Sequence, residues 1–131
     1  MGSFSDYCEN EILDHFFGKG EYAPPTVYVG LSAADPTDSG AGLSEPNGNG
    51  YARAETTEAD WNVAAGGLLD NANVITLGPA TDAWGTLTHF ALFDAASGGQ
   101  LLVHGALTHP KTVESGDTVR FAGGEIDVTL D

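Results

Sequence analysis

Four histidines and one cysteine carry the side chains suited to metal binding or nucleophilic catalysis: His15, His89, His104, His109 and Cys8. A zinc site requires three or four closely spaced ligands. His104 and His109 are expected at a strand end and in a loop. His89 and His104 could approach each other across a β-hairpin, but packing or hydrogen bonding explains such a pair as readily as a metal does. Cys8 falls on the apolar face of a predicted helix, as a small buried side chain would. We therefore predict no metal and no cofactor.

Carboxylates are too numerous to indicate a catalytic pair. Nineteen Asp and Glu residues allow many pairs, so a glycosidase-like pair would be informative only with its geometry. The acidic stretches at 35–42 and 45–50 lack the ligand spacing of a calcium loop, although weak divalent-cation binding by the acidic surface stays open. The sequence also lacks the nucleophile elbow and the glycine-rich phosphate loops. We predict that the protein is not an enzyme, with an acidic hydrolase as the weakest alternative.

The charge balance argues against two classes of partner. Four Lys and Arg residues face nineteen carboxylates, giving a formal net charge of −15. Such a chain repels phosphate backbones and anionic lipids, and affinity for nucleic acid depends on cationic side chains. No stretch approaches the roughly eighteen apolar residues of a membrane-spanning helix. We predict no nucleic-acid partner and no membrane partner.

Length and cysteine content indicate one domain that would gain from association. A chain of 131 residues suits a single domain, 1–131, with a modest core. One cysteine cannot form an intrachain disulfide, so oligomerisation is a natural source of additional buried area. The N-terminus lacks the basic start and apolar run of a secretion signal, which predicts synthesis in the cytoplasm of the producing cell.

Residues 3–17 are predicted to form the one helix. A Ser-Asp pair near its start can cap the first turn, and a glycine ends it. Ile12 and Phe16 recur at helical spacing, with Leu13 and Phe17 beside them, while acidic residues fill the opposite face. Two interpretations remain open. The helix either packs on its own domain, or its aromatic end docks on a neighbour.

The rest of the chain, 24–131, is predicted to be a β domain with a long polar loop at 33–50. Short runs of alternating or apolar residues are separated by Gly, Pro, Asn and Asp, which is typical of strands and turns. The clearest predicted strands lie at 24–32, 51–56, 73–77, 87–94, 100–107 and 125–131. About seven short antiparallel strands at this spacing predict a compact β-sandwich or small barrel with one N-terminal helix.

Either of the two tryptophans could form a carbohydrate platform. Sugars stack on aromatic faces, so Trp61 or Trp84 could serve an adhesin domain. Packing is the better interpretation for both. Tyr51, at the entrance of a strand, is predicted to hold the long loop in place.

The hairpin at 84–107 is apolar on both faces. Phe90 to Phe93 form a continuous apolar run, whereas a half-exposed strand would alternate. We infer that one face meets the core of the domain, and that the other meets the helix, a second subunit or another protein. The residues predicted to take part in an interface are Phe4, Ile12, Leu13, Phe16, Phe17, Phe90 and Leu92.

The order of several motifs resembles a family of small virion proteins of tailed phages. The stretches "SDYCENEILDHFFG", "TVYVGLSAADPTDSGAG", "NGNGYARAE", "WGTLTHFALFDAASGGQLLVHGALTHPKTVESGDT" and "DVTLD" carry the resemblance, which covers nearly the whole chain. Members are often labelled phage tail fibre protein, and the family looks like one of capsid decoration (cement) proteins. None of these motifs is catalytic. The chain departs from the family pattern at Cys8, where a larger apolar residue is usual, and in its high acidity.

The resemblance implies a non-enzymatic virion structural protein, made in the host bacterial cytoplasm. A small chain without repeats suits the capsid surface better than a long modular fibre. The expected partners are the major capsid protein of the same virion and two further copies in a homotrimer, with affinity raised by multivalency. The alternatives are a tail or tail-fibre component and a carbohydrate-binding adhesin domain.

Overall fold

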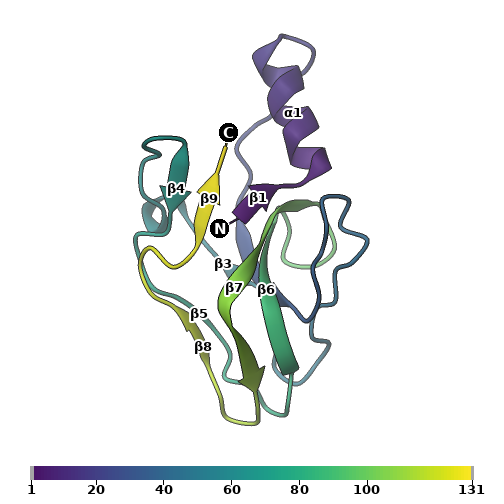
Figure 1. The fold of residues 1–131 in the computed structure, drawn as a ribbon, viewed down its shortest axis with the longest axis vertical. Coiled ribbons are helices and arrows are strands. Elements are labelled where there is room, and N and C mark those ends of the chain that lie inside the picture. The colour runs from purple at the N-terminus through teal and green to yellow at the C-terminus, as the bar shows by residue number, and fades with distance from the viewer. Residues whose placement is uncertain (1, 131) are drawn as a thin grey trace.

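A seven-stranded sheet, curled into a half-barrel, forms the body of the protein, and one helix projects from its end (Figure 1). The computed structural model describes residues 2–130. The elements are β1 (Gly2–Phe4), α1 (Asp6–Phe16), β2 (Tyr28–Ser32), β3 (Ala54–Glu55), a 3-10 turn (Glu58–Asp60), β4 (Leu68–Asp70), β5 (Ile75–Leu77), β6 (Gly85–Phe93), β7 (Leu101–Val113), β8 (Val119–Phe121) and β9 (Asp127–Thr129).

The large sheet has the strand order β3-β2-β6-β7-β1-β9-β4, and β5 pairs with β8 in a second, two-stranded sheet. All pairs are antiparallel except β1 with β9. The predicted mainly β fold with one helix is confirmed. The six clearest predicted strands correspond to β2, β3, β5, β6, β7 and β9, whereas β1, β4 and β8 were not predicted.

The helix begins later than predicted, at Asp6 rather than at residue 3. Ser3 and Phe4 are extended and pair with His104 and Val103 of β7. Ser5 then caps the helix, because its Oγ accepts a hydrogen bond of 3.2 Å from the backbone N–H of Cys8. The prediction of a helix over 3–17 is therefore wrong at its first turn, because those residues complete the sheet instead.

The chain itself covers both faces of the β6–β7 hairpin. Phe90 and Leu92 pack into the main core. On the opposite face Phe93 is buried beneath Leu43 and the Arg53 guanidinium, whose carbon lies 3.4 Å from the centre of the Phe93 ring. The prediction that the second face of this hairpin meets the helix, a second subunit or another protein is wrong, since Leu43 of the long loop and Arg53 cover it.

An ion-pair network holds this loop against the sheet. The Tyr51 hydroxyl donates to a Glu45 carboxylate oxygen at 2.6 Å and accepts from the N–H of Leu31 at 3.0 Å. Arg53 donates to both oxygens of the same carboxylate, at 2.6 and 2.9 Å. The predicted role of Tyr51 in holding the loop is confirmed by these contacts.

Candidate interaction surface

An apolar groove of about 530 Å³ lies between the helix and one end of the sheet. Cys8 and Ile12 of α1 form one wall, and Trp61, Val63 and Leu69 form the facing wall. The floor comes from the ends of several strands: Phe4, Leu92, Leu102, Val103 and Val128. Among the described residues, these segments line a hollow that stays open to solvent.

The groove exists because the helix stands off from the sheet. In Figure 1, α1 projects beyond the strands, and Cys8 is its one buried residue within the described chain. Val63, on the facing wall, is 94% exposed. Hydrophobic side chains that remain in water near an apolar hollow are typical of an interaction site.

The tip of the helix extends this apolar surface. Phe16 and Phe17 are 82% and 71% exposed, and their rings pack edge to face with centroids 5.8 Å apart. Leu13 is 55% exposed. Three large hydrophobic side chains within five positions are costly to leave in water, because burying each would contribute roughly 1.5–3 kcal/mol. The helix tip and the groove together are called the apolar surface below.

The walls of the groove are apolar, but the nearby charges are acidic. Glu58 lines the groove, and no Lys or Arg of residues 2–130 does. Burial, with the Glu11 and Glu9 carboxylates, raises the pKa of the Cys8 thiol to about 11. Among the described residues that line the groove, the one charged side chain is therefore acidic, which favours a cationic over an anionic partner.

One polar atom in the groove has no partner. The Tyr22 hydroxyl is buried without a hydrogen bond within residues 2–130, although Tyr22 lines the groove. Burial, followed by Cys8 and Tyr7, raises the pKa of this phenol to about 12. A phenol is protonated at neutral pH with or without this shift, and the Tyr22 O–H has no acceptor among the described residues.

The structure divides the residues predicted for an interface into three groups. Phe4, Ile12 and Leu92 line the groove, and Leu13, Phe16 and Phe17 lie at the exposed helix tip. Phe90 is 2% exposed and lies in the core instead. Sequence reasoning missed Tyr22, Trp61 and Val63, because they lie in loops whose positions depend on the fold.

The residues considered for metal or sugar binding have other partners. The His104 Nε2 lies 2.8 Å from an Asp38 carboxylate oxygen, and the His89 Nδ1 lies 2.8 Å from the Thr88 hydroxyl. The two histidines are not opposite one another, since His104 pairs with Ala91. Within residues 2–130 no group of three or more candidate ligands is placed to hold a metal ion.

Neither tryptophan offers a free platform on the β surface. Trp84 is 8% exposed and donates from its indole nitrogen to the carbonyl of Asn49 at 2.8 Å. Trp61 donates to the Thr56 hydroxyl at 3.0 Å and packs against the main core. Packing is therefore the role of Trp84, whereas Trp61 packs against the core and also lines the apolar groove.

The fold and the surface define a small β domain with open hollows that are lined by apolar and polar side chains. Comparison with known families gives the family. The profile of "Podophage GP4 fiber I protein gp80" matches residues 3–129, and the chain belongs to this family of phage fibre proteins. It is accordingly a bacteriophage virion protein. No curated protein matches the chain. No helix of the described chain is long and apolar enough to cross a membrane.

Proposed function

We propose that this chain is a non-enzymatic structural subunit of a tail fibre, and that it is attached to another virion protein through the apolar surface. The family match over residues 3–129 carries the proposal. The exposed helix tip and the groove supply a site of attachment, because both would gain stability from burial.

The charges favour a particular kind of attachment segment. The groove has an acidic residue at its edge and no cationic residue among residues 2–130 that line it, and the chain carries a net charge of −15. An apolar segment flanked by Lys or Arg complements both features, since its apolar side chains fill the groove and its charges meet carboxylates. A second copy of this chain would bring two strongly negative surfaces together, which opposes the expected homotrimer.

Capsid decoration is the second candidate, with the major capsid protein as partner. The described chain folds as one body without a repeated or elongated segment (Figure 1), which suits a subunit that sits on a shell. The family description favours the fibre.

Cryo-electron microscopy of intact virions separates these candidates. Density for this domain in a few copies on the tail or its fibres would support the proposal. Density repeated over the icosahedral shell would replace it with capsid decoration. Absence of the chain from purified virions, checked by mass spectrometry, would contradict both.

A charge placed at the helix tip tests the attachment site. Phe16→Asp should abolish incorporation of the chain into virions without lowering its melting temperature, because Phe16 is 82% exposed. Val74→Asp is the matched control, since Val74 is also an exposed hydrophobic residue and lies outside the apolar surface. Equal incorporation of both variants would show that the helix tip is not the attachment site.

A further inference from the structure

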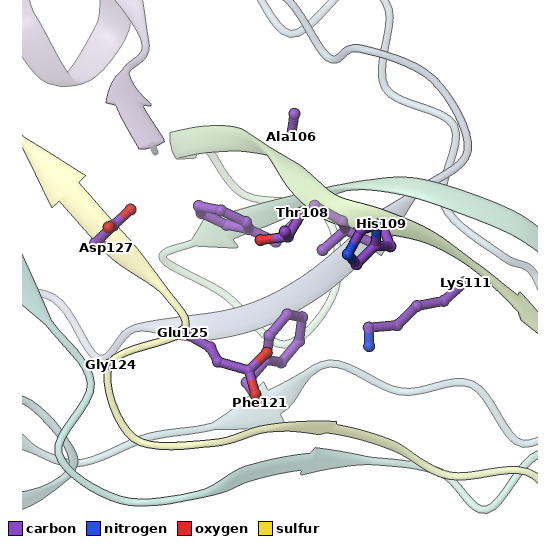
Figure 2. A pocket seen from close by; sticks show the side chains of 10 residues that line it. Ala106, Thr108, His109, Lys111, Phe121, Gly124, Glu125 and Asp127 are labelled. Carbon is purple, nitrogen blue, oxygen red and sulfur yellow. The ribbon is translucent and has the colours of Figure 1, made fainter.

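A second cavity, of about 340 Å³, lies between β7 and the segment that joins β8 to β9 (Figure 2). It shares no lining residue with the apolar groove. The cavity is where the half-barrel stays open: β1 pairs with β7 at 103–105, and no strand within residues 2–130 pairs with residues 106–111 on that side. A ligand can therefore approach the free edge of β7.

The backbone of β7 is displaced at this cavity. Leu87 pairs with Lys111 and His89 pairs with Ala106, so one residue of β6 stands opposite four of β7. Such a bulge redirects side chains, and bulges are common at the rims of barrels and beside binding sites. Thr108 and His109 of the bulge line the cavity, as Figure 2 shows.

The cavity contains a cation without a counter-ion. Within residues 2–130 no carboxylate forms an ion pair with Lys111, although the chain has nineteen carboxylates. The side chain of Lys111 is half-buried and points into the cavity (Figure 2). Arg53, which is also half-buried, pairs with the Glu45 carboxylate. A half-buried, unpaired ammonium group favours the binding of an anion.

The opposite wall is acidic and carries aromatic rings. Glu125 extends into the cavity from the segment before β9, and its Oε1 accepts a hydrogen bond of 3.0 Å from the N–H of Ala122. Phe121 and Phe90 also line the cavity, and each residue is 2% exposed. Glu125 repels a bare anion but accepts hydrogen bonds from hydroxyl groups, and the aromatic surface favours apolar C–H groups.

We propose that this cavity binds a sugar residue that carries a carboxylate. The carboxylate pairs with the Lys111 ammonium group, and ring hydroxyls donate to Glu125 and exchange hydrogen bonds with Thr108. The C–H face of the ring lies against Phe121. A neutral sugar leaves Lys111 unpaired, and a simple carboxylate leaves Glu125 and Phe121 unused. The proposal does not depend on whether the chain stands on a tail or a shell.

Titration of the full chain with D-glucuronate, followed by amide NMR, tests the proposal. Saturable shifts confined to residues 106–111 and 121–127 are expected, with D-glucose and acetate each binding at least about tenfold more weakly. Equal binding of glucose would overturn the role of the carboxylate, and equal binding of acetate would overturn the role of the sugar. No saturable shift with glucuronate would overturn the site.

Two variants and one control assign the binding to this cavity. Lys111→Gln should weaken glucuronate binding about tenfold by removing a charged hydrogen bond. Glu125→Ala should also weaken binding, because it removes the acceptor for the hydroxyl groups of the sugar. Lys19→Gln removes the same charge from an exposed residue outside the cavity and should leave binding unchanged. Unchanged melting temperatures would show that all three variants fold. Equal affinity of Lys111→Gln and Lys19→Gln would contradict the site.

Discussion

At the scale of single residues, Arg53 organises more of the structure than any other charged side chain described. It donates to both Glu45 oxygens, to the carbonyls of Ala95 and Gly98 at 2.8 and 2.9 Å, and stacks on Phe93. One planar guanidinium thereby joins the long loop to the turn after β6. Lysine has no such fork of donors.

Arg53→Met should lower the free energy of unfolding by about 3 kcal/mol, because it leaves the largely buried Glu45 carboxylate without its cation. Urea denaturation of purified protein measures the change. Arg120→Met is the control: Arg120 is exposed on β8, and the same substitution there should cost less than about 0.5 kcal/mol. Similar losses in both variants would show that the Arg53 network contributes little.

The buried thiol predicts a loss of stability at alkaline pH. Burial is the main cause that raises the pKa of Cys8 from 9.0 to about 11. The unfolded chain therefore releases this proton first. The stability that comes from the neutral thiol is complete below about pH 9 and is lost as pH rises towards 11.

Cys8→Ala should flatten this part of the pH profile. Urea midpoints measured from pH 7 to pH 11 should fall less steeply in the variant, although its stability at pH 7 is lower because a core side chain is shortened. The raised pKa of Tyr22 also predicts a loss of stability, at higher pH, but this residue is present in both proteins. Parallel profiles would contradict a role for the thiol.

At the scale of elements, the junction between β1 and α1 depends on Ser5. Its Oγ accepts from the Cys8 N–H and donates to the carbonyl of Leu101 at 2.5 Å, so one hydroxyl caps the helix and fixes it to β7. Ser5→Ala should cost about 1–2 kcal/mol. Ser3→Ala, at an exposed position of β1, should change the urea midpoint little. Equal effects would mean that the cap does not hold the helix.

The sequence predicted the elements that have enough residues to show a pattern. The alternation in β2 and the apolar runs of β6 and β7 identified the central strands. The strands β1, β4 and β8 have three residues each and lie in stretches without a clear pattern. The strands β5 and β9 are equally short, but they lie within the longer apolar or alternating stretches 73–77 and 125–131, which the sequence does show. Pro110 lies within β7, in the bulge where no residue of β6 pairs with it, and strands tolerate proline at such positions.

The candidate sites were predictable only in part. Phe16 and Phe17 were identified because aromatic residues at the end of an acidic helix are conspicuous in sequence. The facing wall of the groove was not, since Val63 lies in a turn-rich segment far along the chain. The sequence did not single out Lys111 either. Its lack of a counter-ion depends on the bulge in β7 and on the cavity between β7 and the segment that joins β8 to β9.

At the scale of the whole molecule, charge and apolar surface act in opposite directions. The net charge of −15 keeps copies of the chain apart at long range, whereas the helix tip and groove favour association at contact. The proposed attachment to a cationic, apolar segment would use this combination, because such a partner removes both the repulsion and the exposed surface.

The same charge predicts that salt stabilises the fold. Carboxylates outnumber cations by nineteen to four, so repulsion between them is stronger in the compact state than in the expanded unfolded chain. Salt at about 0.1 M shortens the screening length to about 10 Å. The melting temperature should therefore rise from low salt to 0.1 M NaCl by about 3–6 °C if roughly 1 kcal/mol of repulsion is removed. Differential scanning calorimetry measures the rise. Replacing Glu9 and Asp14 of α1 together by their amides removes two negative charges and should make the rise in melting temperature with salt smaller. A melting temperature that falls with salt would show instead that attractive ion pairs such as Arg53–Glu45 dominate the electrostatics.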